Sequence, residues 1–207
     1  MFTLIVKGGW VMAPIILLSV VALAIIIERV WVLLSIRLNM ALFAKDVFLD
    51  LQRGDYARAA EKCGSTKHPI GKLFLLGISN RGMKRDQLEK VLEREGEKSV
   101  HGLERGMQAL LIIVGVEPML GFLGTIVGLI AAFMNWEQLG ANVTVSALAG
   151  GIYQAMITTA GGLIAAIPYF ICYHLIEGSI KNQAAQMSYF GEQLLNVLGS
   201  SRREAAV

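Results

Sequence analysis

The sequence has 207 residues and a formal net charge of +3 at pH 7, with 55% apolar but only 17% charged residues. Soluble domains carry about 25% charged residues, so this composition excludes an ordinary water-soluble enzyme domain and indicates a chain embedded in lipid. The small net charge does not indicate a nucleic-acid partner.

The first apolar segment runs from about Trp10 to Leu34, and its length is sufficient to cross a bilayer. It ends in Glu28-Arg29 rather than in a small-residue cleavage site, so we interpret it as a retained transmembrane helix and not as a signal peptide. Residues 1–34 are therefore predicted to form an extracytoplasmic N-terminus and the first transmembrane helix.

The polar segment 35–106 holds 14 of the 19 basic and 10 of the 16 acidic residues. The positive-inside rule places such a segment in the cytoplasm. Apolar residues recur at helical spacing at Phe43, Val47 and Leu51, and residues 86–101 have the pattern of a charged, solvated helix. We therefore expect a helical cytoplasmic domain.

Two further spans follow, at residues 107–135 and 147–176. The connection 136–146 has no Lys or Arg, as expected of an extracytoplasmic loop, and residues 177–207 are predicted to form a cytoplasmic C-terminal helix and tail. The sequence thus predicts an all-α integral membrane protein with three transmembrane helices, its N-terminus outside and its C-terminus inside.

The second and third spans are rich in small residues, which let helix backbones approach closely in lipid. We expect close packing, within an oligomer, at five glycines, and kinks at two prolines. These residues are Gly121, Gly124, Gly128, Gly161, Gly162, Pro118 and Pro168.

Hydroxyl groups occur at matched depth on these two spans. Counted from the outer ends of their helices, Thr125 and the pair Thr158 and Thr159 both lie roughly 15–18 Å deep, near the middle of the bilayer core. Gln154 lies about one turn further out. Such hydroxyls either bond to their own helix backbone or form a path for an ion.

No acidic residue is expected at that depth. Glu28, Arg29 and Glu117 are interpreted as a possible charged site toward the cytoplasmic end, which is costly in lipid unless it faces protein or water. Cys63 and Cys172 are expected to be reduced and structural, and the three histidines, including His68, to be surface or boundary residues. No enzyme signature, metal-ligand pattern or cofactor motif is present in the sequence.

Two long motifs resemble a known family. Residues 117–129 read EPMLGFLGTIVGL and residues 150–168 read GGIYQAMITTAGGLIAAIP. Together they are similar to the signature of the MotA/TolQ/ExbB proton channel family, closest to the ExbB/TolQ branch. The three spans, the large cytoplasmic loop and the Glu28-Arg29 ending fit the same branch.

The resemblance implies a ring-shaped homo-oligomer, a pentamer in well-studied branches, in a bacterial inner membrane. It implies a single-span partner of the ExbD/TolR/MotB type, whose intramembrane aspartate supplies the missing carboxylate. Ion flow would then drive mechanical work across the envelope, for example by energising a TonB-like protein and TonB-dependent import. By position, Thr125 and Thr159 match the pathway threonines of the family.

The sequence also departs from that pattern. Members of the ExbB/TolQ branch commonly carry a glutamate where this chain has Gln154, and a small apolar residue where it has Glu117. We favour protons over sodium as the coupling ion. A Tol-Pal-type or gliding motor subunit, a non-conducting membrane scaffold and a self-sufficient small transporter remain alternatives.

Overall fold

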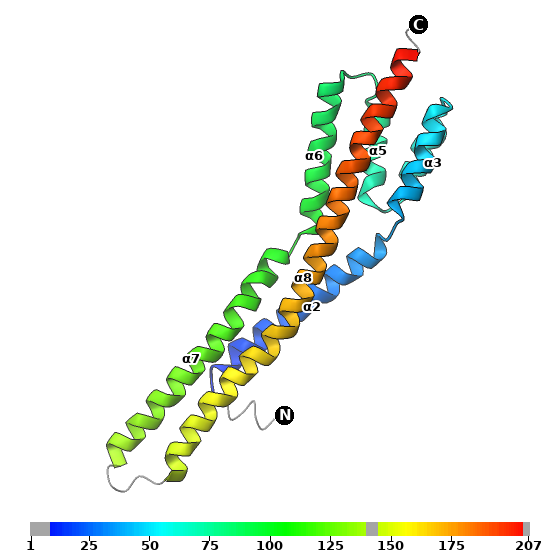
Figure 1. Cartoon of the computed structure of the whole chain (residues 1–207). Coiled ribbons are helices and arrows are strands. Elements are labelled where there is room, and N and C mark those ends of the chain that lie inside the picture. The colour runs from blue at the N-terminus through cyan, green and yellow to red at the C-terminus, as the bar shows by residue number, and fades with distance from the viewer. Residues whose placement is uncertain (1–8, 140–144, 205–207) are drawn as a thin grey trace. The chain divides into compact units, whose positions relative to one another are not determined.

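The computed structural model describes residues 9–139 and 145–204, and helices make up most of these residues (Figure 1). They are α2 (Met12–Ser35), α3 (Met40–Gln52), α4 (Tyr56–Ser65), α5 (Pro69–Ser79), α6 (Arg85–Leu103), α7 (Met107–Leu139) and α8 (Val145–Glu204). The all-α prediction is confirmed for this part of the chain, in which no strand occurs. The predicted N-terminal residues 1–8, residues 140–144 of the predicted loop and the final residues 205–207 lie outside it.

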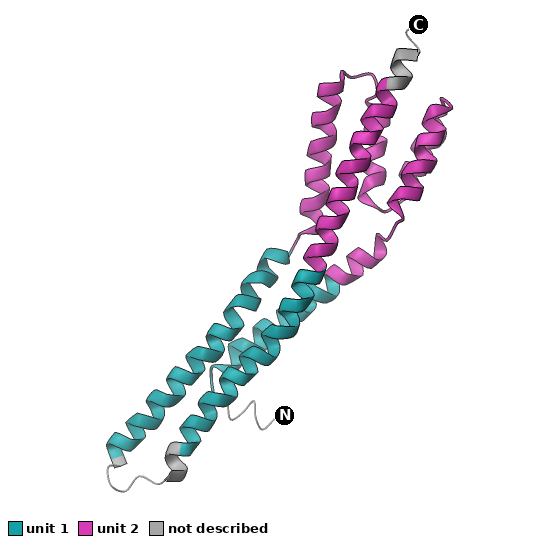
Figure 2. Ribbon diagram, viewed as in Figure 1, with its two compact units in different colours: residues 1–28, 106–175 teal, residues 29–105, 176–207 magenta. Residues whose placement is uncertain are grey.

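The helices fall into two compact units, which Figure 2 shows in different colours. Unit 1 comprises residues 1–28 and 106–175, and unit 2 comprises residues 29–105 and 176–207. Helix α8 contributes to both units because it continues without a break where the sequence predicted the end of a span at residue 176. No proline follows Pro168, and the ion pair of Lys181 with Glu177 at 2.9 Å supports the helix beyond that point.

Helices α2, α7 and α8 are long and apolar enough to cross a bilayer, which confirms the prediction of three candidate spans. Many of their large apolar side chains are exposed on the isolated chain, among them Leu17, Ile27, Phe122 and Ile164. Exposed apolar surface of this extent requires lipid or another protein surface to cover it.

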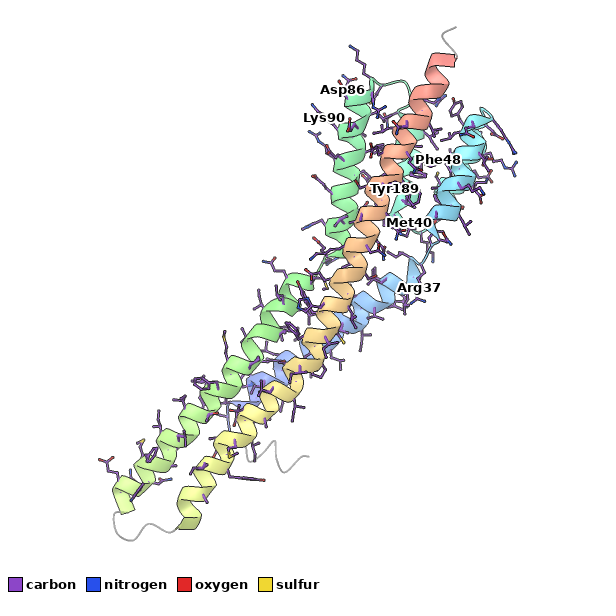
Figure 3. All side chains as sticks on the ribbon, in the orientation of Figure 1. Arg37, Met40, Phe48, Asp86, Lys90 and Tyr189 are labelled. Carbon is purple, nitrogen blue, oxygen red and sulfur yellow. The ribbon has the colours of Figure 1, made fainter. Side chains whose placement is uncertain are left out.

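Unit 2 has an apolar core to which α3, α4, α5, α6 and the second part of α8 contribute. Phe74 of α5 lies at its centre, with its ring centroid 6.0 Å from that of Phe43 and 5.5 Å from that of Phe48. Asp86 and Lys90 are exposed on the side of α6 away from α8, as Figure 3 shows. The helix is therefore amphipathic, as its sequence pattern predicts.

The expectation that His68 is a surface or boundary residue is wrong. It is only 3% exposed and precedes the first residue of α5, where its Nδ1 accepts a hydrogen bond from the Ile70 backbone N–H at 3.1 Å. Burial lowers the pKa of His68. The neutral ring can accept this bond, so the residue serves as an N-cap, which periodicity alone does not reveal.

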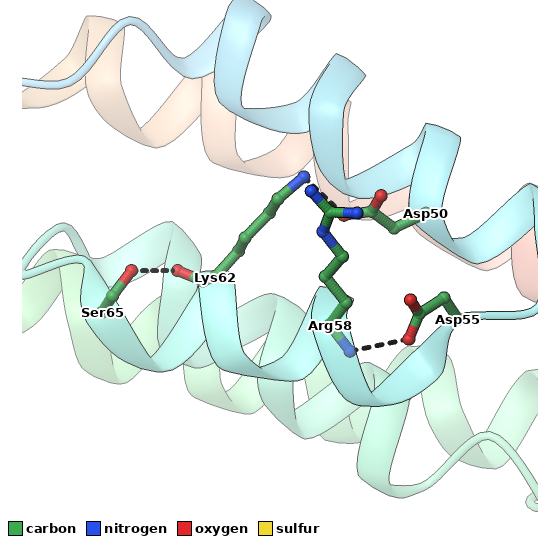
Figure 4. A network of polar contacts seen from close by, with 5 residues as sticks. All are labelled: Asp50, Asp55, Arg58, Lys62 and Ser65. Atoms are coloured by element: carbon green, nitrogen blue, oxygen red, sulfur yellow. Dashed lines mark hydrogen bonds and ion pairs between the residues drawn. The ribbon is translucent and has the colours of Figure 1, made fainter.

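Polar contacts join α3 to α4 and fix the start of α4 (Figure 4). The Lys62 ammonium lies 2.5 Å from the Asp50 carboxylate, and the Asp55 carboxylate accepts from the Arg58 backbone N–H at 3.0 Å. The hydrogen bond from Lys62 is the main cause that holds the pKa of Asp50 below its usual range. The ionised form of Asp50 is therefore stabilised in the folded protein.

We expect the substitution Asp50→Asn to lower the stability of unit 2 at neutral pH. Because folding depresses the pKa of Asp50, its contribution is present above the unfolded value and is lost as the pH falls through the folded value. The difference between the variant and the wild type should therefore shrink in acid. Urea unfolding of the full-length protein in detergent, followed across pH, measures this. Asp46→Asn, an exposed acid on the same helix, should show no such difference.

A second expectation concerns Cys63, which is 2% exposed in the core of unit 2. Burial raises the pKa of the Cys63 thiol to about 12, and the thiolate is the reactive form. In a Cys172→Ser background, iodoacetamide should therefore modify Cys63 of the native protein at least tenfold more slowly than Cys63 of the urea-unfolded chain. Each tenfold difference in rate corresponds to about 1.4 kcal/mol of protection. Mass spectrometry of the intact protein reads this out, and equal rates would contradict it.

Candidate functional site

The candidate site is built on a seam of small residues where α7 and α8 meet in unit 1. Gly121, Gly124, Gly128 and Ala132 recur on one face of α7 at spacings of three or four residues, and Gly151, Ala155, Thr158 and Gly162 do so on α8. We call these eight residues the α7–α8 seam. The spacing places each set along one stripe of its helix.

The backbones approach too closely in this seam for larger residues. A Cβ atom on Gly128 would lie 2.9 Å from the Ala155 Cβ, and one on Gly162 would lie 2.7 Å from the Glu117 carbonyl oxygen. Gly161 faces a different neighbour, because a Cβ there would lie 3.1 Å from the terminal methyl of Met12 on α2. Small side chains are therefore a steric requirement at these positions.

Thr125 and Thr159 meet across the seam. Their hydroxyl groups are in direct hydrogen-bond contact, and the Thr159 hydroxyl also donates to the Gly121 carbonyl at 2.9 Å. Both side chains are half-buried. The depth count placed Thr125 and Thr159 at one level, and the structure brings their half-buried hydroxyls into contact.

Thr158 has a different environment from Thr159. It is fully buried, its hydroxyl donates to the Gln154 carbonyl of its own helix at 2.9 Å, and its side chain packs against Gly124. One residue along an α-helix rotates the side chain by roughly 100°, so two neighbours at one depth point to different faces. Thr158 thus has the hydrogen bond to its own helix that the back-bonding alternative describes.

Gln154 does not reach the threonine pair in the structure. Its side-chain amide lies against the backbone of Gly9, just before α2, where Gly9 has a φ of +72°. The positive φ favours glycine at this position, and a Cβ there would displace the end of the Gln154 side chain.

Glu117 lies in the interior of unit 1. It is fully buried, and the Ser19 Oγ of α2 lies at hydrogen-bond distance, 2.8 Å, from its Oε1. Tyr169 of α8 lies beside them, close enough to share a hydrogen bond with Ser19. The sequence analysis missed Ser19 and Tyr169. Ser19 could have been found because it lies on the same α2 stripe as the buried residues Ile15, Ala22 and Ile26.

The three residues assigned to one charged cytoplasmic-side site have separate environments. Glu28 is exposed on α2, about 13 Å along that helix from Ser19 and hence from the level of Glu117. In unit 2 the Arg29 guanidinium donates to the carbonyls of Gly102 and Leu103, at 3.3 and 3.2 Å. The sequence did not predict the contact of Glu117 with Ser19, because it does not reveal the register of α2 against α7.

Pro118 and Pro168 lie inside α7 and α8, which are helical on both sides of them. Each proline removes one backbone N–H from its helix. The described residues contain no cluster of three or more metal-ligating side chains.

The sequence matches the model of the MotA/TolQ/ExbB proton channel family over residues 65–189, more than half of its length. The chain belongs to this family. The match confirms the family resemblance that the two motifs predict. It also confirms the general class of function, that of an energy-transducing membrane protein of a proton channel family.

Individual relatives of this ExbB-family chain carry biopolymer transport names. The ExbB-like 1 protein of Synechocystis is 33% identical over 187 residues, 89% of this chain and 72% of the relative. The ExbB-like 3 protein of the same organism is 32% identical and covers 86% of this chain and 85% of its own length. ExbB of Neisseria gonorrhoeae is 37% identical over 76 residues, 37% of this chain and 34% of its own.

Proposed function

We propose that this chain is the ion-conducting subunit of a membrane motor that uses the proton motive force to do mechanical work across the cell envelope. The observation that supports this most directly is the half-buried hydroxyl pair of Thr125 and Thr159. Hydroxyls can pass on a proton or briefly hold a small cation without trapping it, because they carry no charge of their own. We favour the proton, with sodium as the alternative ion.

In this proposal the motor also contains further copies of the chain and a partner protein. Several copies of the chain, a pentamer by family resemblance, form a ring in the bacterial inner membrane, with the N-terminus in the periplasm and unit 2 in the cytoplasm. A single-span partner of the ExbD/TolR/MotB type contributes an intramembrane aspartate. The exposed apolar faces of α2, α7 and α8 support association with copies, partner and lipid. Energised import through a TonB-like protein is the favoured output.

Proton flux into liposomes tests this function. The full-length chain is reconstituted with and without its single-span partner, a pH gradient is applied, and flux is followed with an internal pH-sensitive dye in sodium-free and sodium-containing buffer. We expect flux that needs the partner and does not need sodium. A Thr125→Val/Thr159→Val double variant should lose it. Unchanged flux in that variant would exclude the threonine pair as the path. No flux even with the partner would favour a non-conducting scaffold, and flux without the partner would favour a self-sufficient transporter.

A further inference from the structure

The carboxyl of Glu117 in unit 1 is a buried polar group that the proposed function does not explain. It is fully buried within a predicted membrane span, about 15 Å along α7 from Met107. Its Oε1 is in contact with Ser19, whereas its Oε2 is buried without a hydrogen-bond partner among the described residues. A buried, half-satisfied carboxyl of this kind is costly and needs a physical explanation.

Among the described residues of unit 1, no basic side chain balances an ionised carboxylate at Glu117. The described part of unit 1, residues 9–28, 106–139 and 145–175, contains no lysine or arginine. The titratable group that faces Glu117 is Tyr169 of α8, with Cys172 near that phenol, and α2 contributes the neutral Ser19. An isolated buried carboxylate costs several kcal/mol, so the group is stable there only with a proton or a cation bound.

The hydrogen bonds around Ser19 fit the protonated form. The Ser19 Oγ lies 2.8 Å from the Glu117 Oε1 and 2.9 Å from the Ile15 carbonyl oxygen. A hydroxyl has one proton to donate but can accept as well. If Glu117 is protonated, its O–H donates to Ser19 while the Ser19 hydroxyl donates to Ile15, and both contacts are satisfied at once. If Glu117 is ionised, the single Ser19 proton can serve only one of these two contacts, although the Ile15 carbonyl keeps its backbone hydrogen bond within α2.

Glu117 also lies on the seam side of α7. Glu117, Gly121 and Thr125 follow one another at intervals of four residues, so they share one face of the helix and span about 12 Å along its axis. The Gly121 carbonyl accepts from Thr159, and the Glu117 carbonyl lies against Gly162. The carboxyl is thus two helical turns from the hydroxyl pair.

We propose that Glu117 is a proton-binding station of this chain itself, which holds a proton between α2, α7 and α8 and exchanges it with the path at Thr125 and Thr159. The exchange rests on the proposed function, whereas the binding of the proton does not. The carboxylate takes up one proton and becomes a neutral carboxyl, and the reverse step returns that proton to the path. A carboxylate of the partner is then not the sole titrating group of the membrane domain.

Infrared spectroscopy of the full-length protein in lipid tests the proton directly, because the C=O stretch of a protonated carboxyl is separate from the bands of a carboxylate. At neutral pH the wild type should show this band, and Glu117→Gln should lose it. Glu137→Gln, an exposed acid on the same helix, should retain it. An identical spectrum for wild type and Glu117→Gln would overturn the proposal. If the band disappears on addition of sodium, Glu117 binds a cation in place of the proton, and this result would overturn the proposal too.

A second measurement uses dicyclohexylcarbodiimide, which adds to protonated carboxyl groups in apolar surroundings to give a stable acylurea. Peptide mass spectrometry should find the adduct on Glu117 and not on the exposed Glu28 or Glu137. Labelling confined to the exposed acids would contradict the proposal. If Thr159→Val leaves flux intact while the infrared band is present, the proposed function fails and the station stands. If flux requires Thr159 and the infrared band is absent, the proposed function stands and the proton-binding station at Glu117 fails.

Discussion

A chain carrying Thr159→Val should enter the membrane and assemble like the wild type but lose at least about tenfold in proton flux and coupled activity. Valine keeps the shape of threonine and removes the hydroxyl. The Gly121 carbonyl then loses a donor at 2.9 Å, and Thr125 loses the partner that it meets across the seam. The Gly121 carbonyl keeps its helix hydrogen bond and the Thr125 hydroxyl at 3.4 Å, so the substitution acts on the hydroxyl path itself. Each 1.4 kcal/mol added to the barrier for ion passage lowers the rate about tenfold.

Two control variants distinguish the loss of the hydroxyl from a general disturbance of packing. Thr159→Ser restores the hydroxyl and should recover most of the flux. Thr158→Val applies the same change one residue earlier, where the hydroxyl bonds to its own helix at Gln154, and should leave flux nearly unchanged. Flux is measured in liposomes and assembly by size-exclusion chromatography of the detergent-solubilised complex. Equal loss in Thr158→Val and Thr159→Val would show that packing, and not the hydroxyl path, is what the substitutions disturb.

The second large effect is expected from Gly128→Leu, which should destabilise the α7–α8 seam. A Cβ at this position would lie 2.9 Å from the Ala155 Cβ and 3.1 Å from the Gly151 carbonyl oxygen, both of which belong to the facing helix. The helices must therefore separate, which costs roughly 1–3 kcal/mol or more. Since about 2–4 °C of Tm corresponds to each kcal/mol in a chain of this size, thermal unfolding in detergent should shift by several degrees.

Gly115→Leu is the matched control for this prediction. Gly115 lies on the same helix, is exposed, and a Cβ there would meet nothing within 4 Å. The same substitution should therefore leave the thermal unfolding of the solubilised chain within experimental error. A smaller shift for Gly128→Leu than for Gly115→Leu would mean that α7 and α8 do not pack along these residues.

Much of this architecture could be predicted from the sequence, because it depends only on the positions of residues along the chain. Apolar length predicts α2, α7 and α8, and counting at 1.5 Å per residue brings Thr125 to the level of Thr159. A depth count has no angular information, however, so it could not separate Thr159 from Thr158. The helical phase that separates them is fixed by the contacts of Gly124 and Gly121.

Glu117 shows what such counting leaves out. Counting along α7 gives the position of Glu117 on its own helix, whereas the register of a second helix brings Ser19 against it. Register between helices depends on the packing of side chains such as Val11, Met12 and Ile15 against Leu120. These contacts are long-range, and no periodicity in a single sequence encodes them. His68 escaped prediction for a related reason, since its capping role depends on burial by distant segments.

The hydroxyl pair has a consequence for assemblies of mixed composition. Thr125 and Thr159 come from the same chain, so each copy carries a complete pair and does not depend on a neighbour to finish it. In a symmetric ring of n copies in which every pair must act once per revolution, a fraction f of defective copies leaves only (1 − f)^n of the rings fully functional. Activity should therefore fall more steeply than the share of normal chains, and a minority of altered subunits would behave as a dominant inhibitor.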